Sequence, residues 1–366
     1  MPKPFVLISA LMNMRRSTDC CGFLLVLFCC LLFSRTGRGQ RTQNQQPLTA
    51  INILFYNVEN YFDFQNDSGP GDDDYLPDAP RHWTAGKFYR KTDHLAKVIL
   101  ACGGFSPPAI IGLSEVENQH VLEFLTTRSP LAALNYRIIH KESPDHRGID
   151  VAVLYRPAIV HPLRFNFIPL RNAAGDILPT REILHVVFFL PPDTIDVFVN
   201  HWPSRYGGYS PSEPERCLAA ATLRKQVLQV LQQRKTAKII LTGDFNDQPA
   251  SKSIRKVLGA VPVEQMSALS PLVNLADFGT RGTIKYRQQW QTFDQFIVSR
   301  HLLPAGAGKG WMTSDSCCRI VRLPFLVEPD PKYSGKRLFR TYRGYHYEGG
   351  FSDHLPVMLH LNLRSF

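Results

Sequence analysis

Short apolar runs recur along the chain from residue 51 onward, and each has the length of a single β-strand. Runs of about four to eight apolar and β-branched residues are typical of strands that are buried on both faces. The runs at 183–190 and 195–200 lie too close together for a helical crossover, so part of the sheet must be antiparallel. Strands are therefore predicted over 51–56, 109–113, 151–155, 183–190, 195–200, 238–241, 292–298 and 355–361.

Two other segments, residues 86–101 and 213–234, repeat their apolar residues at helical spacing. Ser212 and Glu215 have the spacing of a capping box, which predicts that the second helix starts there. Strands outnumber helices and the sheet is partly antiparallel, so the pattern predicts a mixed α/β fold. The residues that share a face are Phe88, Leu95, Val98 and Ile99 in the first segment, and Leu218, Leu223, Val227, Leu228 and Leu231 in the second.

Residues 63–82 are acidic and rich in turn-forming residues, with Asp72, Asp73 and Asp74 in succession. This pattern predicts a long surface loop. Solvated charge is the favoured explanation for its carboxylates, and calcium binding is the alternative.

Polar side chains with chemical capability stand at one end of several predicted strands. A single polar strand end is usually a turn, and the segment from Gly243 to Asp247 would fit one. In a mixed sheet, however, the start of one strand lies beside the end of its antiparallel neighbour, so all of these side chains can meet on one rim. The polar ends are Asn57 with Glu59, Ser114 with Glu115, Asn200 with His201, Asp244 with Asn246, Asp294, and Asp353 with His354.

The capable groups of this set are carboxylates, carboxamides and imidazoles. Hard oxygen ligands without a cysteine cluster suit Mg²⁺, with Mn²⁺ or Ca²⁺ as alternatives, rather than zinc. The histidines add acid–base capacity near neutral pH. This combination suits the hydrolysis of phosphate esters, in which a metal neutralises the phosphoryl oxygens and a base activates water.

The chain is basic, with a formal net charge of +11 at pH 7, and it stays positive without residues 1–40. Its composition, 44% hydrophobic and 20% charged, is that of an ordinary globular protein. A basic exported protein suits an anionic partner such as nucleic acid, phospholipid or another polyanion. Solubility alone is the competing explanation, and charge does not decide between the two.

The amino terminus has the pattern of a secretory signal. Arg15 and Arg16 precede an apolar run over 21–33, which is short for a membrane span. We therefore predict export to a secreted, periplasmic or cell-surface location, with a membrane anchor or lipidation at Cys29 and Cys30 as alternatives. Residues 1–40 are assigned to the signal peptide and a short linker, and 41–366 to a single domain.

Four cysteines follow the predicted signal: Cys102, Cys217, Cys317 and Cys318. Adjacent cysteines rarely bridge each other, so Cys102 and Cys217 are the candidate disulfide, and buried free thiols are the alternative. Their spacing does not support a zinc site.

Six short motifs follow one another along the chain: Asn57-Val-Glu-Asn, Gly112-Leu-Ser-Glu115-Val, Asn200-His201-Trp, Thr242-Gly-Asp244-Phe-Asn246, Thr292-Phe-Asp294-Gln-Phe and Ser352-Asp353-His354-Leu-Pro356. In this order they resemble the endonuclease/exonuclease/phosphatase superfamily. That group includes deoxyribonuclease I, the apurinic endonucleases, neutral sphingomyelinases and inositol polyphosphate 5-phosphatases. Segments such as 147–155, 179–184 and 340–354 resemble exported bacterial members in particular. The resemblance implies a four-layer α/β/β/α sandwich of two mixed sheets.

The resemblance also implies a role for each matching residue. Glu115 is expected to be the main metal ligand, with Asn57 and Asp353 close to the ion. Asp244 and Asn246 are expected to contact the attacking water and the phosphate.

His354 is expected to face the scissile phosphate, with its tautomer fixed by Asp294. His201 matches the second histidine of the deoxyribonuclease I and sphingomyelinase branches. Apurinic endonucleases typically have tyrosine there, so His201 argues against abasic-site repair. Either Asp244 or His201 is expected to transfer a proton. Glu59 is predicted to take part in metal binding, with a salt bridge at the rim as the alternative.

Three residues are predicted to bind substrate near the expected cleft. Arg181 precedes a strand and is predicted to clamp phosphate, unless it forms a structural ion pair. Arg205 and Tyr206 follow His201 in a loop rich in glycine and proline. Residues 332–347 hold five Lys/Arg and four Tyr, a mixture that suits single-stranded nucleic acid unless the tyrosines serve packing.

These patterns predict an exported, divalent-metal-dependent phosphodiesterase, with a nuclease acting on DNA or RNA as the first expectation. We expect a monomer with no stable protein partner. The first alternative keeps the chemistry and changes the substrate, as in a phosphatase or phospholipase C-type enzyme acting on an inositol phosphate or a phospholipid headgroup. The second is a non-catalytic binding protein on a degenerate version of the fold. The presence of every expected metal and catalytic residue argues against that second alternative.

Overall fold

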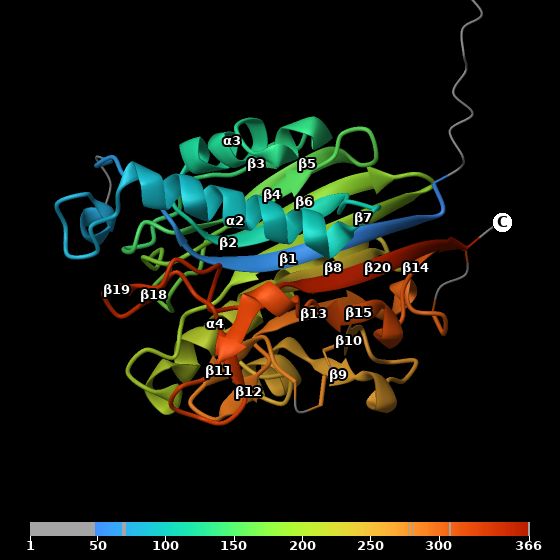
Figure 1. Cartoon of the computed structure of the whole chain (residues 1–366). Helices are drawn as coiled ribbons and strands as arrows, with labels where there is room; N and C mark the ends of the chain where they lie inside the picture. The colour runs from blue at the N-terminus through green and yellow to red at the C-terminus, as the bar shows by residue number, and fades with distance from the viewer. Residues whose placement is uncertain (1–47, 68–70, 277, 280, 307–308, 365–366) are drawn as a thin grey trace, which may run out of the picture. The chain divides into compact units, whose positions relative to one another are not determined.

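The computed structural model describes residues 48–67, 71–276, 278–279, 281–306 and 309–364. Contacts among Leu48–Phe366 form one compact unit (Figure 1). Within the described ranges, none of the helices combines the length and hydrophobicity needed to cross a membrane. The predicted signal peptide lies outside the described residues, so export stays a prediction.

Seven strands form the first sheet, in the spatial order β14-β20-β1-β2-β4-β3, with β15 also paired to β20. β1 and β2 are parallel, whereas β20 and β4 run antiparallel to them. The ends of β1 and β2 therefore lie beside the starts of β20 and β4. The bounds are β1 Ala50–Tyr61, β2 Ile110–Val116, β3 Arg137–Ile139, β4 Asp150–Tyr155, β14 Gly310–Met312, β15 Cys318–Ile320 and β20 Val357–Arg364.

The second sheet also has seven strands, in the order β5-β6-β7-β8-β13-β10-β9. β7 and β8 are parallel, and β13 runs antiparallel to β8. The start of β13 thus lies beside the ends of β7 and β8. The bounds are β5 His161–Ile168, β6 Ile183–Leu190, β7 Asp193–His201, β8 Lys238–Asp244, β9 Ala260–Pro262, β10 Leu272–Asn274 and β13 Asp294–Ser299.

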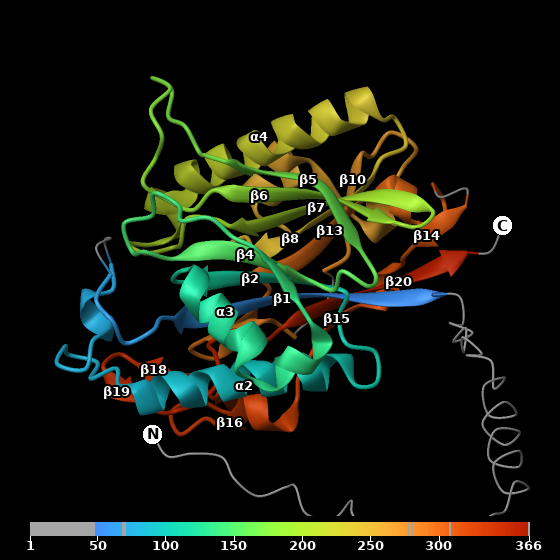
Figure 2. The same ribbon diagram turned by 90° about the horizontal axis from the view of Figure 1, so that it is seen from above.

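Helices cover the outer faces of both sheets, and the sheets pack against each other (Figure 2). α2 (Ala85–Gly103) and α3 (Gln119–Thr127) lie on the first sheet, and α4 (Tyr209–Gln233) lies on the second. The predicted four-layer α/β/β/α sandwich is confirmed. The described part of the chain also contains several short 3-10 helices, a π-helix over Ser253–Leu258 and three small hairpins. The hairpins are β11 Ile284–Tyr286 with β12 Gln289–Gln291, β16 Val327–Pro329 with β17 Lys336–Leu338, and β18 Tyr342–Arg343 with β19 His346–Tyr347.

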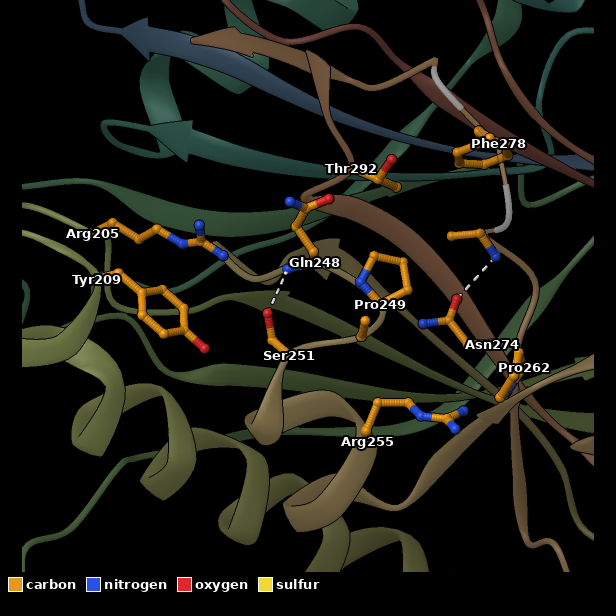
Figure 3. Close-up of a pocket in the computed structure, with 13 residues that line it drawn as sticks. Arg205, Tyr209, Gln248, Pro249, Ser251, Arg255, Pro262, Asn274, Phe278 and Thr292 are labelled. Atoms are coloured by element: carbon orange, nitrogen blue, oxygen red, sulfur yellow. Dashed lines mark hydrogen bonds between the residues drawn. The ribbon is translucent and has the colours of Figure 1, made fainter. Parts of the chain in front are cut away.

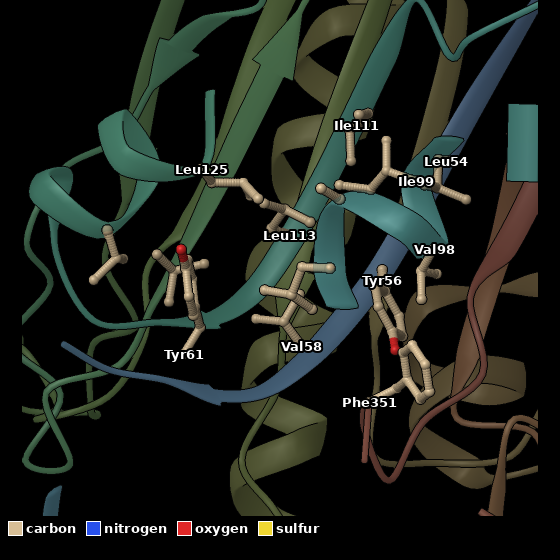
Figure 4. Packing of buried hydrophobic residues seen from close by; sticks show 14 of the residues in the cluster. Leu54, Tyr56, Val58, Tyr61, Val98, Ile99, Ile111, Leu113, Leu125 and Phe351 are labelled. Atoms are coloured by element: carbon tan, nitrogen blue, oxygen red, sulfur yellow. The ribbon is translucent and has the colours of Figure 1, made fainter. Parts of the chain in front are cut away.

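β1 shows why the central strands have unbroken apolar sequences. Alternate side chains of a strand point to opposite faces. Leu54 and Tyr56 join the cluster beneath α2 (Figure 4), whereas Ile53 and Phe55 join the cluster between the two sheets. Because both faces of β1 are covered, both sets are apolar, and each large buried side chain stabilises the fold by about 1.5–3 kcal/mol.

Every strand predicted from the apolar runs is present, and β6 has the predicted bounds of 183–190. β5 was missed because it is an edge strand in which most side chains are exposed. The strands of three residues, such as β9 and β14, are too short to produce a recognisable pattern.

The two predicted helices are also present, but α4 begins at Tyr209, and the predicted capping box is wrong. Ser212 lies inside the helix, where its Oγ donates to the Gly208 carbonyl at 2.6 Å. The same Oγ accepts a hydrogen bond of 2.7 Å from Arg216. Because Arg216 is fully buried, Ser212 supports that guanidinium instead of capping the helix.

The four cysteines after the predicted signal are free, so the candidate disulfide is wrong. Cys102 lies on α2 and Cys217 lies on α4, which cover opposite outer faces of the sandwich.

The acidic segment 63–82 is only partly a solvated surface loop. Asp63 and Asp72 are buried, and Tyr75 packs into the core beneath α2. Solvation therefore does not account for two of its carboxylates.

Candidate active site

The two sheets bring the polar strand ends together at one rim. In the register of the second sheet, His201 lies opposite Asp244 where β7 and β8 end. Asp294 lies opposite Asp244 on its other side, where β13 begins. Asn57, from the first sheet, donates from Nδ2 to Asp244 Oδ2 at 3.1 Å and to Glu115 Oε1 at 3.4 Å. Residues far apart in sequence thus contact one another across the two sheets.

His354 lies between two carboxylates. Its Nδ1 is 2.7 Å from Asp294 Oδ2, which is the contact expected to fix its tautomer, and its Nε2 is 3.7 Å from Asp244 Oδ2. Burial lowers the pKa of His354, but the charges of Asp294 and Asp244 outweigh burial and raise it well above the ordinary value of 6.5. The ring is therefore cationic at neutral pH and can donate a hydrogen bond to an anionic oxygen.

His201 has the opposite electrostatic environment. Its Nε2 is 3.7 Å from Asp244 Oδ2 and 3.9 Å from Glu115 Oε1. Burial, followed by the positive charges of Arg181 and Arg147, lowers the pKa of His201 well below its ordinary value. Its Nδ1 is buried and has no hydrogen-bond partner among the described residues. The rim thus contains one neutral and one cationic imidazole.

Asp244 and Asn246 are held by their surroundings. Burial, together with the nearby Asp294 and Glu115 carboxylates, raises the pKa of Asp244 to about 7. The backbone N–H of Asn246 donates to Asp244 Oδ1 at 2.8 Å, and its Nδ2 donates to the Trp202 carbonyl at 3.0 Å. These contacts fix the carboxamide of Asn246 and leave its Oδ1 as an acceptor.

The backbone at the rim is strained at several residues. Glu59, Asn60, Glu115 and Asn246 have φ angles of 52°, 51°, 63° and 49°, in the left-handed region that side-chain-bearing residues rarely adopt. Each such residue costs on the order of 1–3 kcal/mol and persists only where surrounding contacts hold it. The Asn60 N–H, for example, donates to Glu115 Oε2 at 3.0 Å. Three of these four residues, Glu59, Glu115 and Asn246, belong to the predicted site, and strain at such positions is typical of a functional site.

The expected ligands Asn57, Glu115 and Asp353 fit a divalent cation. All three are hard oxygen donors, and the Glu115 side chain is 12% exposed. Asn57 and Glu115 lie beside Asp244, whose pKa is raised by burial and, in addition, by the nearby Asp294 and Glu115 carboxylates. Asn57 Oδ1 now accepts from the Glu59 N–H at 3.0 Å, so the carboxamide would have to turn to offer that oxygen to an ion.

Both carboxylate oxygens of Glu59 are engaged by protein donors. Its Oε1 accepts from Arg340 at 2.8 Å, and its Oε2 accepts from the Thr341 N–H at 2.8 Å. Arg340 also binds Asp353 at 2.7 Å. The structure therefore places Glu59 in the rim salt bridge that the sequence allowed as the alternative to metal binding.

In the described part of the chain, two groups of three side chains have ligand atoms within 4.8 Å of one another. The group of Asp244, Asp294 and His354 lies at the rim, and because His354 Nδ1 is engaged by Asp294 we interpret it as a proton relay. The second group, His140, Glu142 and Asp150, lies at the start of β4.

The three predicted substrate residues have different environments. Arg181 is 5% exposed, pairs with Asp145 at 2.7 Å and donates to the Trp202 carbonyl. The structure therefore places Arg181 in a structural ion pair and not in a free phosphate clamp. Arg205 pairs with Asp247 at 2.8 Å, and Tyr206 is 94% exposed.

Two pockets flank the loop that carries Arg205 and Tyr206. One, of about 700 Å³, is lined by Arg205, Tyr209 and Gln248 among others (Figure 3). The other, of about 630 Å³, is lined by Arg147, Arg181 and Tyr206 among others. Both combine positive charge with an aromatic ring.

Three residues at the rim were not predicted. The Arg147 guanidinium lies 3.8 Å from Glu115 Oε2 and is 38% exposed, so it can reach a bound anion. Arg340 joins Glu59 to Asp353. Ser352 donates to the Asn57 carbonyl at 2.7 Å and accepts from the His354 N–H, which ties the start of β20 to β1.

The basic and aromatic segment 332–347 is largely engaged in packing. Tyr342 is buried against Trp83, and Arg337 and Arg343 both pair with Glu348. Packing therefore accounts for Tyr342 and ion pairing for Arg337 and Arg343, whereas Tyr345 is 62% exposed.

The model of the Endonuclease/Exonuclease/phosphatase family matches residues 52–363. No curated protein sequence matches the chain. Among solved structures, a family protein from Bacteroides thetaiotaomicron is 15% identical, with a TM-score of 0.52 over 86% of this chain and 96% of that chain.

Two further structures have the same fold. D. rerio TDP2 complexed with a single-strand DNA product is 15% identical, with a TM-score of 0.52 over 86% of this chain and 99% of that chain. A mannosyl-6-phosphatase from Bacteroides thetaiotaomicron VPI-5482 is 16% identical, with a TM-score of 0.53 over 85% and 99%. The family match covers nearly all of the described chain and the whole rim, and the chain therefore belongs to the endonuclease/exonuclease/phosphatase family.

Proposed function

We propose that the protein is an exported, divalent-metal-dependent phosphodiesterase that cleaves DNA or RNA. One observation carries the hydrolytic chemistry: Asp294, His354, Asp244 and His201 form a continuous series at the rim, with one cationic and one neutral imidazole. Groups whose pKa values are driven apart are typical of acid–base catalysis.

In this proposal His354 binds and orients the phosphate. Its cationic ring donates from Nε2 to a non-bridging phosphoryl oxygen and stabilises the negative charge that grows there during attack. Asp294 holds the ring through Nδ1. If the His354 ring were neutral, its hydrogen bond to the phosphoryl oxygen would be weaker.

Asp244 accepts the proton of the attacking water, and Asn246 Oδ1 helps to orient that water. A pKa near 7 suits a general base that works at neutral pH. His201 is within 3.7 Å of Asp244 Oδ2 and can exchange a proton with it or hydrogen-bond the phosphate.

Members of this family generally depend on divalent metals. Glu115, Asn57 and Asp353 would hold the ion, which when bound neutralises charge on the phosphoryl oxygens. Mg²⁺ is our first choice because the donors are carboxylate and carboxamide oxygens.

Nucleic acid is favoured by the surroundings of the rim. Arg147 and the exposed Tyr206 line one flanking pocket, and Arg205 with Tyr209 lines the other. Arginines for backbone phosphates and aromatic rings for bases are typical of single-strand binding. The DNA product in the TDP2 complex supports this choice, whereas the mannosyl-6-phosphatase supports a smaller phosphate ester.

A substrate panel tests the proposal. Purified protein would be incubated with plasmid DNA, single-stranded DNA, RNA, sphingomyelin, inositol phosphates and a sugar phosphate, each with Mg²⁺, Mn²⁺, Ca²⁺ or EDTA. We expect Mg²⁺-dependent cleavage of nucleic acid that EDTA abolishes. Hydrolysis of a small phosphate ester without cleavage of nucleic acid would replace the nuclease proposal with the phosphatase alternative.

A further inference from the structure

Arg340 lies between two carboxylates at the rim. Its Nε donates to Glu59 Oε1 at 2.8 Å, and its Nη2 lies 2.8 Å from the same oxygen and 2.7 Å from Asp353 Oδ2. The Glu59 side chain is 4% exposed, whereas the Asp353 side chain is 22% exposed. The guanidinium therefore connects a buried carboxylate at the end of β1 to a more open carboxylate that is one of the expected metal ligands.

The Glu59 carboxylate is held on both of its oxygens. Oε2 accepts from the Thr341 N–H at 2.8 Å, and Oε1 accepts from Arg340. The Glu59 backbone has a φ of 52°, a conformation that persists only where surrounding contacts hold it. Glu59 is thus a rigid anchor for the guanidinium, and its negative charge offsets the positive charge of Arg340.

The segment that carries Arg340 is itself fixed from below. Lys91, which is 1% exposed on α2, donates from Nζ to Thr341 Oγ1 at 2.6 Å and to the Phe351 carbonyl at 2.5 Å. The Gly350 N–H donates to the Arg340 carbonyl at 3.0 Å. These hydrogen bonds join the chain around Arg340 to the chain that leads into β20, so the two sides of this segment cannot separate.

We propose that Arg340 is a positioning residue: anchored by Glu59, it fixes the orientation of the Asp353 carboxylate toward the divalent cation. This inference rests on the proposed function, in which Asp353 is one of the metal ligands. The contact with Arg340 engages Asp353 Oδ2, so Oδ1 can serve as the ligand atom. A planar guanidinium that binds two carboxylates restricts their rotation, whereas a lysine ammonium is a point charge that does not impose the same geometry.

The charge of Arg340 by itself would act in the opposite direction. A cation beside the site repels a metal ion, so loss of an arginine that acted through charge alone would tighten metal binding. Because Glu59 offsets that charge, the pair contributes orientation without a net positive charge. Contacts that orient metal ligands typically change metal affinity by about 10–100-fold. Loss of Arg340 should therefore weaken metal binding, and the sign of the change separates the two explanations.

The test measures Mn²⁺ binding by isothermal titration calorimetry, because Mn²⁺ takes the same oxygen ligands as Mg²⁺. The proteins are the native chain, Arg340→Met, Glu59→Gln and the double variant, with circular dichroism and thermal unfolding to verify folding. We expect Arg340→Met to raise the Kd for Mn²⁺ by at least about tenfold. The double variant should have a Kd within about twofold of Arg340→Met alone, because Glu59 acts through Arg340.

Two further variants keep the test decisive. Arg343→Met removes an arginine of the same segment that pairs with Glu348, and it should keep the native Mn²⁺ affinity. Arg340→Lys keeps a positive charge beside Glu59, so it tests the geometry even if Arg340→Met does not fold, and it should also weaken Mn²⁺ binding.

The outcomes distinguish this inference from the proposed function. Native or tighter Mn²⁺ affinity in the folded Arg340 variants would overturn the positioning role and leave the proposed function standing. If Mn²⁺ binding depends on Arg340 as expected but the native protein cleaves no phosphodiester, the proposed function fails and the positioning role stands. A native protein that binds no Mn²⁺ would overturn both.

Discussion

At the residue scale, the environment of the rim shifts the pKa values of two buried histidines in opposite directions. His354 lies against Asp294 and Asp244, whereas His201 lies near Arg181 and Arg147. The order of the motifs predicted that the two histidines would lie in the active site, and the family resemblance implied the Asp294–His354 contact. The sequence left open whether Arg181 would clamp phosphate or form a structural ion pair. It did not predict the partner Asp145, because an ion pair between residues far apart in the sequence has no local signature.

Asp294→Asn should lower the pKa of His354, because the largest charge that stabilises its imidazolium is removed. An NMR titration of the ring would show this downward shift. An unchanged His354 pKa in a folded variant would contradict the electrostatic role given to Asp294.

The same substitution should make stability depend on pH in a defined way. The folded pKa of His354 lies above 6.5, so its pairing stabilises the fold fully below pH 6.5 and loses this effect as pH rises through the folded pKa. Asp294→Asn should therefore lower the free energy of unfolding by about 1.5–3 kcal/mol at acidic pH and by much less at alkaline pH. Urea unfolding at several pH values would measure the difference, and a loss that grows with pH would contradict it.

At the element scale, buried strands and an amphipathic helix were predictable, whereas edges and ends were not. β1 and β6 are covered on both sides, so burial required unbroken apolar sequences. β5 lies at an edge and carries a weaker pattern. The start of α4 was wrong because Ser212 serves the buried Arg216, a contact that depends on the packing of α4 against the end of β8.

Asp247, which follows β8, holds that junction together. It is fully buried and pairs with Arg205 at 2.8 Å and with Arg216 at 2.9 Å. Asp247→Ala should lower the free energy of unfolding by about 3–5 kcal/mol, because it leaves the buried Arg216 without a counter-charge. Chemical denaturation would measure the loss. Asp176→Ala, at an exposed loop position, is the matched control and should be close to neutral.

At the scale of the whole molecule, the two sheets must pack closely for the rim to form. Asn57 and Glu115 come from one sheet, and Asp244 and Asp294 come from the other. The sequence predicted the four layers through a family resemblance. The distances between the sheets depend on side-chain packing that no short motif encodes.

Gly112 on β2 tests that packing. A Cβ at this position would lie 3.1 Å from a Phe55 ring carbon and 3.2 Å from a Val199 methyl group of the facing sheet. Gly112→Leu should therefore destabilise the fold by about 1–3 kcal/mol through overpacking. Thermal unfolding beside Gly86→Leu, where a Cβ has room, would check this. Equal stability of the two variants would contradict the close sheet contact.

The central claim is that the rim hydrolyses phosphodiesters. Glu115 would hold the metal, and His354 would donate a hydrogen bond to the phosphate. The most direct measurement is the rate of Mg²⁺-dependent DNA cleavage by the native protein, Glu115→Gln and His354→Ala, with Glu123→Gln as the control and circular dichroism to verify folding. We predict cleavage by the native and control proteins, and a loss of about 10²–10⁴-fold in the two rim variants. Cleavage at the native rate by either folded rim variant would contradict the account.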